Sequence, residues 1–155
     1  MKKTITLLLL SLIAVSAYAQ DISDHAIGLR LGDGDGYGAE ITYQRALGDN
    51  NRLEIDLGIE SGDDFNGFKA TGIYQWVWNI DGGFNWYAGA GGGLGTADRD
   101  NDDSGVFLLA AGQVGIEYNF DIPLQLSLDL RPEIYFGGFR DGFDPDIALS
   151  VRYRF

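Results

Sequence analysis

The sequence predicts an all-β protein: an eight-stranded antiparallel up-and-down transmembrane β-barrel. Three observations predict this fold: an N-terminal segment typical of exported proteins, eight stretches of alternating apolar and polar residues, and connections that are alternately short and long. Alternation with period two separates the two faces of a strand, whereas a helix needs a period of 3.6 residues. An even number of strands, with short turns at one end and longer loops at the other, is typical of a transmembrane barrel.

Residues 1–19 have the features of a secretory signal peptide. Lys2 and Lys3 precede an apolar run, and Ala17-Tyr-Ala19 supplies the small residues of a cleavage site. The apolar run is too short to cross a bilayer, which needs about 20 residues. We therefore expect residues 1–19 to be removed and residues 20–155 to form one outer-membrane β-barrel domain.

The composition excludes two classes of protein. The chain has no cysteine, so disulfides cannot compensate for a small core. Acidic residues outnumber basic ones by 23 to 11, giving a formal charge of −12, and loss of Lys2 and Lys3 makes it −14. Nucleic acid is therefore not expected as a partner.

The first four expected strands cover residues 27–32, 37–44, 53–60 and 68–80. The third is the clearest, because Leu, Ile, Leu and Ile alternate with Glu, Asp, Gly and Glu throughout. The fourth is less regular but gathers Phe, Ala, Tyr and two Trp residues on one face. Strands rather than helices follow from this periodicity.

The last four expected strands cover residues 84–94, 106–120, 124–131 and 147–155. Leucine occupies every second position of the seventh strand, and the eighth ends in alternating aromatic and arginine residues. Short turns are expected at 48–51, 79–83 and 121–123, and longer connections at 33–36, 61–67, 95–105 and 137–146. This arrangement would place both chain ends in the periplasm.

The polar face distinguishes a membrane barrel from a soluble one, because both share period two. It carries charges of both signs on nearly every strand, which a soluble barrel would expose to water and a membrane barrel would enclose. Aromatic residues also gather near the short turns, where a membrane barrel has an interfacial girdle: Tyr43, Trp76, Trp78, Phe84, Trp86, Tyr118, Phe120, Tyr153 and Phe155. We expect a lumen ion-pair network formed by Arg30, Glu40, Glu54, Asp56, Lys69, Glu117, Asp129, Arg131, Glu133, Arg152 and Arg154.

The last nine residues, Ile147 to Phe155, resemble the C-terminal β-signal of Gram-negative outer-membrane proteins, with Val151, Tyr153 and Phe155 as the outward residues. The mature chain is similar to the small eight-stranded outer-membrane β-barrel family, of the OmpA-transmembrane-domain or OmpX type. The resemblance implies an outer-membrane location, with membrane lipid and the barrel-assembly machinery as partners. It does not fix the function, since such barrels include adhesins, stabilising envelope proteins and a few enzymes.

A closed barrel of eight strands is just wide enough for side chains to fill it, so an open pore is not expected. The first and last strands must adjoin, which brings Arg30 near Arg152 and Arg154. An ion-paired plug is the favoured interpretation. The predicted function is a non-enzymatic envelope-structural or surface-interaction role, with an unknown extracellular ligand. Two alternatives stay open: a narrow channel or transporter for a small or apolar solute, and a soluble periplasmic ligand-binding barrel.

The long connections are acidic and hold eleven aspartates: Asp33, Asp35, Asp63, Asp64, Asp98, Asp100, Asp102, Asp103, Asp141, Asp144 and Asp146. Loose cation binding at Asp98, Asp100, Asp102 and Asp103 is an alternative to simple solvation. An EF-hand is excluded, because its sixth position would be Asp103 and its twelfth Leu109 instead of glycine and glutamate. We therefore expect no resident metal and no cofactor.

Two further features argue against an enzyme. His25, the single histidine, lies at the very start of the first expected strand, on the periplasmic side, and has no obvious serine partner to form a nucleophile and base pair. The glycine-rich segment 88–95 follows strand alternation and leads into an acidic loop, so it is not a nucleotide-binding loop. Its inward Gly89, Gly91 and Gly93 are expected to leave room for Phe107 and Leu109, or for Tyr87.

Overall fold

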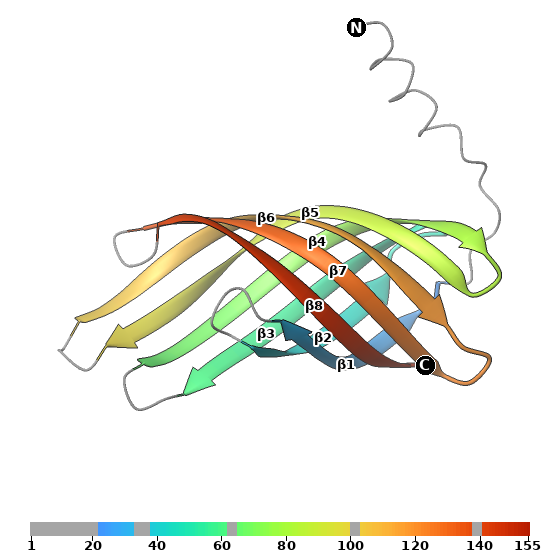
Figure 1. Cartoon of the computed structure of the whole chain (residues 1–155), viewed down its shortest axis with the longest axis horizontal. Coiled ribbons are helices and arrows are strands. Elements are labelled where there is room, and N and C mark those ends of the chain that lie inside the picture. The colour runs from blue at the N-terminus through green and yellow to red at the C-terminus, as the bar shows by residue number, and fades with distance from the viewer. Residues whose placement is uncertain (1–21, 33–37, 62–64, 100–102, 138–140) are drawn as a thin grey trace, which may run out of the picture.

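The computed structural model describes residues 22–32, 38–61, 65–99, 103–137 and 141–155. They form a closed antiparallel barrel of eight strands, which confirms the predicted fold class (Figure 1). The expected signal peptide lies outside the described residues. The strands are β1 (His25–Gly32), β2 (Ala39–Ala46), β3 (Asn51–Ser61), β4 (Phe65–Asp81), β5 (Phe84–Arg99), β6 (Asp103–Asn119), β7 (Leu124–Phe136) and β8 (Gly142–Arg154).

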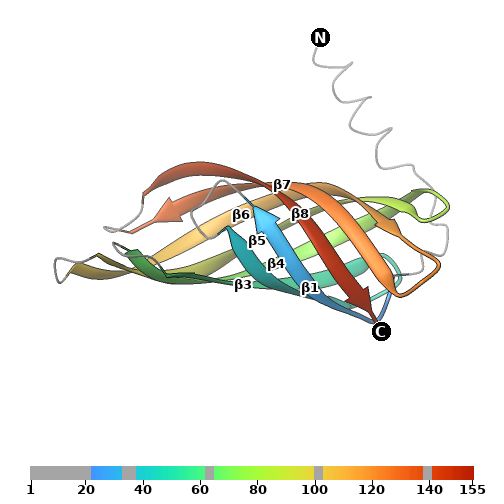
Figure 2. The ribbon, with the colours of Figure 1, turned by 60° about the horizontal axis from the view of Figure 1, so that its bottom comes forward.

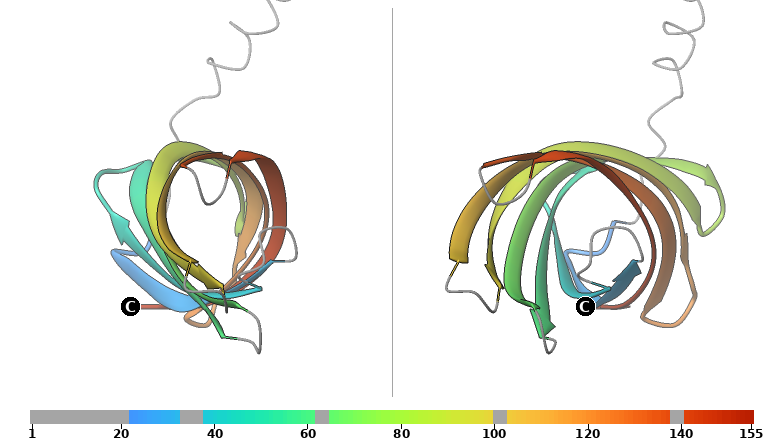
Figure 3. Two further views of the ribbon diagram at one scale, coloured as in Figure 1. Left: turned by 90° about the vertical axis from the view of Figure 1, so that its left-hand side faces the viewer. Right: turned by 60° about the vertical axis from the view of Figure 1, so that its left-hand side comes forward.

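Each strand pairs with its neighbours in sequence, and β1 pairs with β8 to close the ring (Figure 3). The terminal residue completes this seam: the His25 amide donates to the Phe155 carbonyl at 3.1 Å, and the Phe155 amide donates back at 2.9 Å. The His25 ring also stacks on the Phe155 ring, with centroids 5.4 Å apart. Closure satisfies the strand edges that an open sheet would leave unpaired.

Every strand except β2 is longer than the sequence analysis predicted. The β5–β6 ladder continues to the pair Arg99 and Asp103, which leaves residues 100–102 as the connection instead of 95–105. Strand β8 begins at Gly142, so Asp144 and Asp146 belong to a strand and not to a loop. The predicted boundaries stopped at the last clearly apolar outward residue, whereas backbone pairing continues through polar residues.

Strand length varies strongly around the barrel. Strands β1 and β2 have 8 residues each, and β4 and β6 have 17. Figure 2 shows that β1 ends well short of the longer strands at the end of the barrel opposite the C-terminus. That end is called the loop end here, and the end that carries residues 47–50, 82–83 and 120–123 is called the turn end.

The two faces of the sheet separate as predicted. Outward Ile55 and Leu128 are 39% and 48% exposed, whereas their neighbours Glu54 and Asp129 are buried in the lumen. An apolar cluster also lies inside the barrel, formed by Ile73, Phe107, Leu109, Ala111 and Tyr135. The described residues contain no helix long and apolar enough to cross a membrane.

Glycines make room for the large inward rings, but two of them are not those that were predicted. A Cβ at Gly95 would lie 2.3 Å from the Phe107 ring. A Cβ at Gly115 would lie 2.5 Å from the Tyr87 ring. The expected roles of Gly89, Gly91 and Gly93 were therefore wrong, because each ring lies against the glycine directly paired with it in the register, Gly95 for Phe107 and Gly115 for Tyr87. The atoms nearest a Cβ at Gly89, Gly91 or Gly93 belong to β4.

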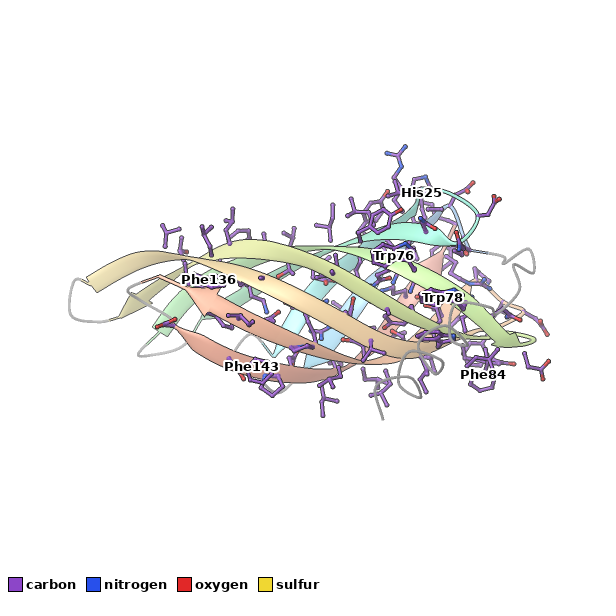
Figure 4. All side chains as sticks on the ribbon, turned by 90° about the horizontal axis from the view of Figure 1, so that it is seen from above. His25, Trp76, Trp78, Phe84, Phe136 and Phe143 are labelled. Carbon is purple, nitrogen blue, oxygen red and sulfur yellow. The ribbon has the colours of Figure 1, made fainter. Side chains whose placement is uncertain are left out.

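Aromatic side chains gather at the turn end, as the predicted girdle requires (Figure 4). The rings of Trp78 and Trp86 stack with centroids 4.3 Å apart, and those of Phe84 and Tyr118 lie 4.6 Å apart. Phe136 and Phe143 lie toward the opposite end in the same view and are 53% and 66% exposed. The outer surface thus has aromatic side chains toward both ends of its apolar band.

Candidate functional site

The candidate site is the charged lumen, and Arg131 of β7 lies in its middle. Its guanidinium contacts Glu40 at 3.3 Å and Glu54 at 3.1 Å, and it also bonds to Asp56. Glu133 lies 4.0 Å from the same guanidinium. One cation therefore links carboxylates from β2, β3 and β7 across the barrel.

Arg30 of β1 forms the second centre of the network. It contacts Glu40 at 2.8 Å, Asp129 at 2.7 Å and Asp146 at 2.6 Å. The partners come from β2, β7 and β8, so this arginine ties both sides of the β1–β8 seam together. Asp146 was predicted to lie in an acidic loop, and its place in the lumen corrects that expectation.

Arg152 of β8 joins Arg131 through a shared carboxylate. Its guanidinium contacts Glu54 at 2.8 Å and donates to Ser127 Oγ at 2.8 Å. Gln44 and Gln113 donate to the same glutamate at 2.6 Å and 3.0 Å. Glu54 is therefore held by hydrogen bonds and ion pairs from several strands, which offsets the cost of burying its charge.

Arg52 of β3 is a lumen residue that the sequence analysis missed. It contacts Glu117 at 2.6 Å, donates to Gln75 at 2.5 Å and lies 4.9 Å from the centre of the Tyr87 ring. The third strand was expected to begin at Leu53, two residues after its observed start at Asn51. The inward parity of Glu54 and Asp56, continued by two residues, would have identified Arg52.

Lys69 of β4 connects the network to the inward aromatic cluster. Its Nζ lies 3.2 Å from Glu40 and 3.3 Å from Glu133. The hydroxyl of Tyr135 donates to Glu133, and the Tyr135 ring packs edge-on against Phe107 at 5.4 Å. The charged network and the apolar cluster are therefore continuous within the barrel.

Arg154 lies apart from this network, contrary to the prediction. Its guanidinium donates to the backbone carbonyls of Phe120 and Ile122 at 2.5 Å and 3.1 Å. It lines a polar cavity of about 460 Å³ at the turn end, together with Asn79 and Asn85. Arg154 therefore holds a turn at the mouth of the barrel, whereas Arg152, two residues earlier, lies deep in the lumen.

The lumen network is densely packed and contains more carboxylates than cationic side chains. Its charged side chains are each at most 2% exposed, so they fill the interior instead of lining a water-filled pore. The described part holds seven such carboxylates and five such cations: Glu40, Glu54, Asp56, Glu117, Asp129, Glu133 and Asp146, with Arg30, Arg52, Lys69, Arg131 and Arg152. Buried charges of this kind require paired and hydrogen-bonded partners.

The predicted cation site is not among the groups that the structure describes. Asp100 and Asp102 lie outside the described residues, and Asp98 and Asp103 are placed in β5 and β6 by their backbone. Within the described ranges no group of three or more histidine, cysteine or acidic side chains is arranged to hold a metal ion. Cation binding by the acidic loop therefore stays a prediction.

The proposed assembly residues lie on the outer face of β8. Val151, Tyr153 and Phe155 are 42%, 57% and 60% exposed, and the last two rings stack. His25 lies beside them, with its Nδ1 2.7 Å from the Tyr43 hydroxyl. The histidine therefore packs at the outer surface of the seam and not in the lumen.

Comparison with known proteins finds matches among solved structures. No family model matches the chain, and no curated protein matches its sequence. The N-terminal β-barrel domain of Pseudomonas aeruginosa OprF matches with a TM-score of 0.68 and 15% identity, covering 86% of this chain and 98% of that one.

Two further solved structures have the same architecture. Neisserial surface protein A matches with a TM-score of 0.60 and 12% identity, covering 84% of this chain and 94% of that one. Ail, the attachment invasion locus protein of Yersinia pestis, matches with a TM-score of 0.58 and 16% identity, covering 86% and 97%. The chain thus has the fold of the small eight-stranded outer-membrane β-barrels, as its sequence predicted.

Proposed function

We propose that the chain is a non-enzymatic outer-membrane protein whose closed barrel supports loops at the cell surface, in an envelope-structural or surface-interaction role. The observation that carries this proposal is the lumen, which is filled by ion pairs that join most of the strands. A plugged interior leaves the loop end and the outer wall as the surfaces available for function.

The outer surface supports the membrane location. Large apolar side chains such as Leu29, Ile116 and Leu149 are about half exposed on it, and aromatic rings lie toward both ends of the band. A soluble barrel would enclose these side chains, because contiguous apolar patches of this size are rare on soluble monomers. The soluble ligand-binding alternative is therefore disfavoured.

The structure gives less support to the two other functional classes. A transporter needs a continuous path, and Arg131, Arg30 and Lys69 with their carboxylates cross the centre of the barrel. An enzyme of the serine and histidine type needs its base beside a nucleophile, and His25 packs instead against Tyr43 and Phe155.

The similar structures favour a surface role by their names alone. One is called a surface protein and another an attachment invasion locus protein. We propose that the acidic loop end of this chain likewise meets an extracellular ligand. Membrane lipid and the barrel-assembly machinery are the other proposed partners, the latter through the outward residues of β8.

The absence of native cysteine allows a direct test of location and orientation. Asp141→Cys lies exposed at the loop end, and Asp49→Cys lies exposed in a turn at the other end. In intact cells, a membrane-impermeant maleimide should label Asp141→Cys alone, and both variants after the outer membrane is permeabilised. Release of the protein by osmotic shock, or the opposite labelling order, would contradict the proposal.

A further inference from the structure

Among the strand residues whose side chains are described, Arg45 is the single arginine or lysine on the outer wall. It lies on β2 with the outward parity of Ile41 and Tyr43, and its side chain is exposed. The other described arginine and lysine side chains have the inward parity: Arg30, Arg52, Lys69, Arg131, Arg152 and Arg154. The lumen network therefore does not account for Arg45, which faces the surroundings of the barrel.

Arg45 lies at the height of the aromatic girdle. It pairs with His25 on one side and with Leu53 on the other, and Leu53 pairs in turn with Tyr74. The turn 47–50 follows directly after β2. Figure 4 shows His25 at this end of the barrel. Because aromatic girdles mark the boundary between membrane and water, Arg45 lies where lipid headgroups meet the outer wall.

The guanidinium of Arg45 has no acceptor on the barrel itself. In the described part of the chain it forms no ion pair and no side-chain hydrogen bond. The polar ends of the neighbouring rings are already engaged with other side chains. The Tyr43 hydroxyl lies 2.7 Å from His25 Nδ1. The Tyr74 hydroxyl accepts from the Asn51 amide. The N–H donors of the guanidinium must therefore find acceptors outside the protein.

The acidic side chains near this position do not neutralise Arg45. Asp24 precedes β1, and Asp49 lies in the turn after β2. Both are exposed, and neither forms an ion pair with Arg45. Toward the middle of the wall, Tyr43 pairs with Ile55 and continues the surface with a ring and an aliphatic side chain. Arg45 is therefore a lone cation between water and an apolar wall.

We propose that Arg45 binds the phosphate of a phospholipid headgroup in the leaflet at the turn end, and that it favours anionic over zwitterionic phospholipid. A guanidinium donates two parallel hydrogen bonds to phosphate oxygens. An anionic headgroup brings a net negative charge to a cation that the barrel leaves unneutralised, whereas a zwitterionic headgroup also brings an ammonium group that Arg45 repels. Tyr43 and Ile55 offer apolar surface to the acyl chains of the same lipid. This inference rests on the outer-membrane location proposed above.

Photochemical crosslinking from two turns tests the site. Leu47 in the turn after β2 is 53% exposed, and Ile122 in the turn between β6 and β7 is 61% exposed. The chain has no cysteine, so Leu47→Cys and Ile122→Cys each give one position for a benzophenone maleimide. Each labelled protein is folded into vesicles with equal amounts of phosphatidylglycerol and phosphatidylcholine. After illumination, mass spectrometry counts the lipid adducts.

The probe at Leu47 should capture about five times more phosphatidylglycerol than phosphatidylcholine, the factor that one cation near an anionic lipid surface provides. The probe at Ile122 should capture the two lipids almost equally. Adding Arg45→Gln should reduce the ratio at Leu47 to that at Ile122. Arg45→Lys keeps the charge but loses the paired donors, so its ratio should be intermediate. Arg154→Gln removes a cation from the same end of the barrel and should leave the ratio at Leu47 unchanged.

An unchanged ratio in Arg45→Gln, or an equal loss in Arg154→Gln, would overturn the inference and leave the membrane location intact. Equal enrichment of phosphatidylglycerol at the Ile122 probe would also overturn it. Loss of the enrichment on adding inorganic phosphate at constant ionic strength would show a site for free anions and overturn the assignment to lipid. If neither probe captures lipid in protein that circular dichroism shows to be folded, the membrane location itself is contradicted. If Arg154→Gln fails to fold, the Ile122 probe is the remaining control.

Discussion

Replacing Arg131 with methionine should destabilise the folded barrel more than any change at its outer rim. Within the described residues, the ion pair of Asp56 is with Arg131, whereas Glu40 also contacts Arg30 and Lys69. The substitution leaves Asp56 as a buried carboxylate without a cation. Removing one partner of a buried ion pair costs about 3–5 kcal/mol. We expect this loss in urea unfolding of protein refolded in phospholipid vesicles, followed by tryptophan fluorescence.

Double variants identify which charge causes the loss. Adding Asp56→Asn to Arg131→Met removes the unpaired charge, and should recover about 1–3 kcal/mol of stability. Adding Glu40→Gln instead should recover less, because Glu40 keeps two other cations. A loss below about 1 kcal/mol for Arg131→Met, as for an exposed pair, or equal recovery by both second substitutions, would refute the account of the network.

Three further predictions follow from the faces and the seam. Leu128→Arg on the lipid face should cost about 2–4 kcal/mol in vesicles, and Tyr153→Arg near the interface about 0–1 kcal/mol; equal costs would contradict the assigned depth. Gly115→Ala should cost about 1–3 kcal/mol by crowding the neighbouring tyrosine ring, whereas the outward Gly112→Ala should stay within about 0.5 kcal/mol. Phe155→Ala keeps the two backbone hydrogen bonds of the seam, so its stability to unfolding in detergent should change little while its cellular yield falls. Deletion of Phe155 should lower both the cellular yield and the stability in detergent. Unchanged cellular yield of Phe155→Ala would remove the assembly-signal argument.

The sequence predicted the faces of the strands because period two is a local property. Apolar and polar residues alternate without an error from Leu53 to Glu60, so each side chain is assigned to one face of the sheet without knowing which strands lie beside it. The inward position of Glu54 and the outward position of Ile55 therefore needed no knowledge of the barrel. Closure followed from the predicted eight-stranded barrel, because the first and last strands of a closed barrel must adjoin.

Strand ends and partners could not be predicted in the same way. Polar residues at a strand end look like loop residues, so Asp146 was assigned to a loop although it contacts Arg30. Arg154 shares the inward parity of Arg152, but its height at the mouth depends on the tilt of the barrel. Which cation meets which carboxylate depends on the shift in register between strands around the closed barrel, and no local pattern in the sequence encodes that shift.

The pairing of the buried charges limits the passage of ions through the lumen. Ions entering from the turn end would pass Arg154 at the mouth and then meet Arg52, Glu117 and the shared carboxylate of Glu54, which are already held by ion pairs. Passage would require several ion pairs to break together. Because leaving one buried charge unpaired is costly, this requirement makes a stable open state unfavourable.

We expect the paired charges to close the lumen of a membrane-embedded barrel. Electrical recording of the purified, folded protein in a planar lipid bilayer tests it most directly. We expect insertion without discrete conductance steps, and protease protection of the same preparation in vesicles checks that the protein has inserted. Reproducible, long-lived conductance steps with ion selectivity would contradict it and establish the barrel as a channel.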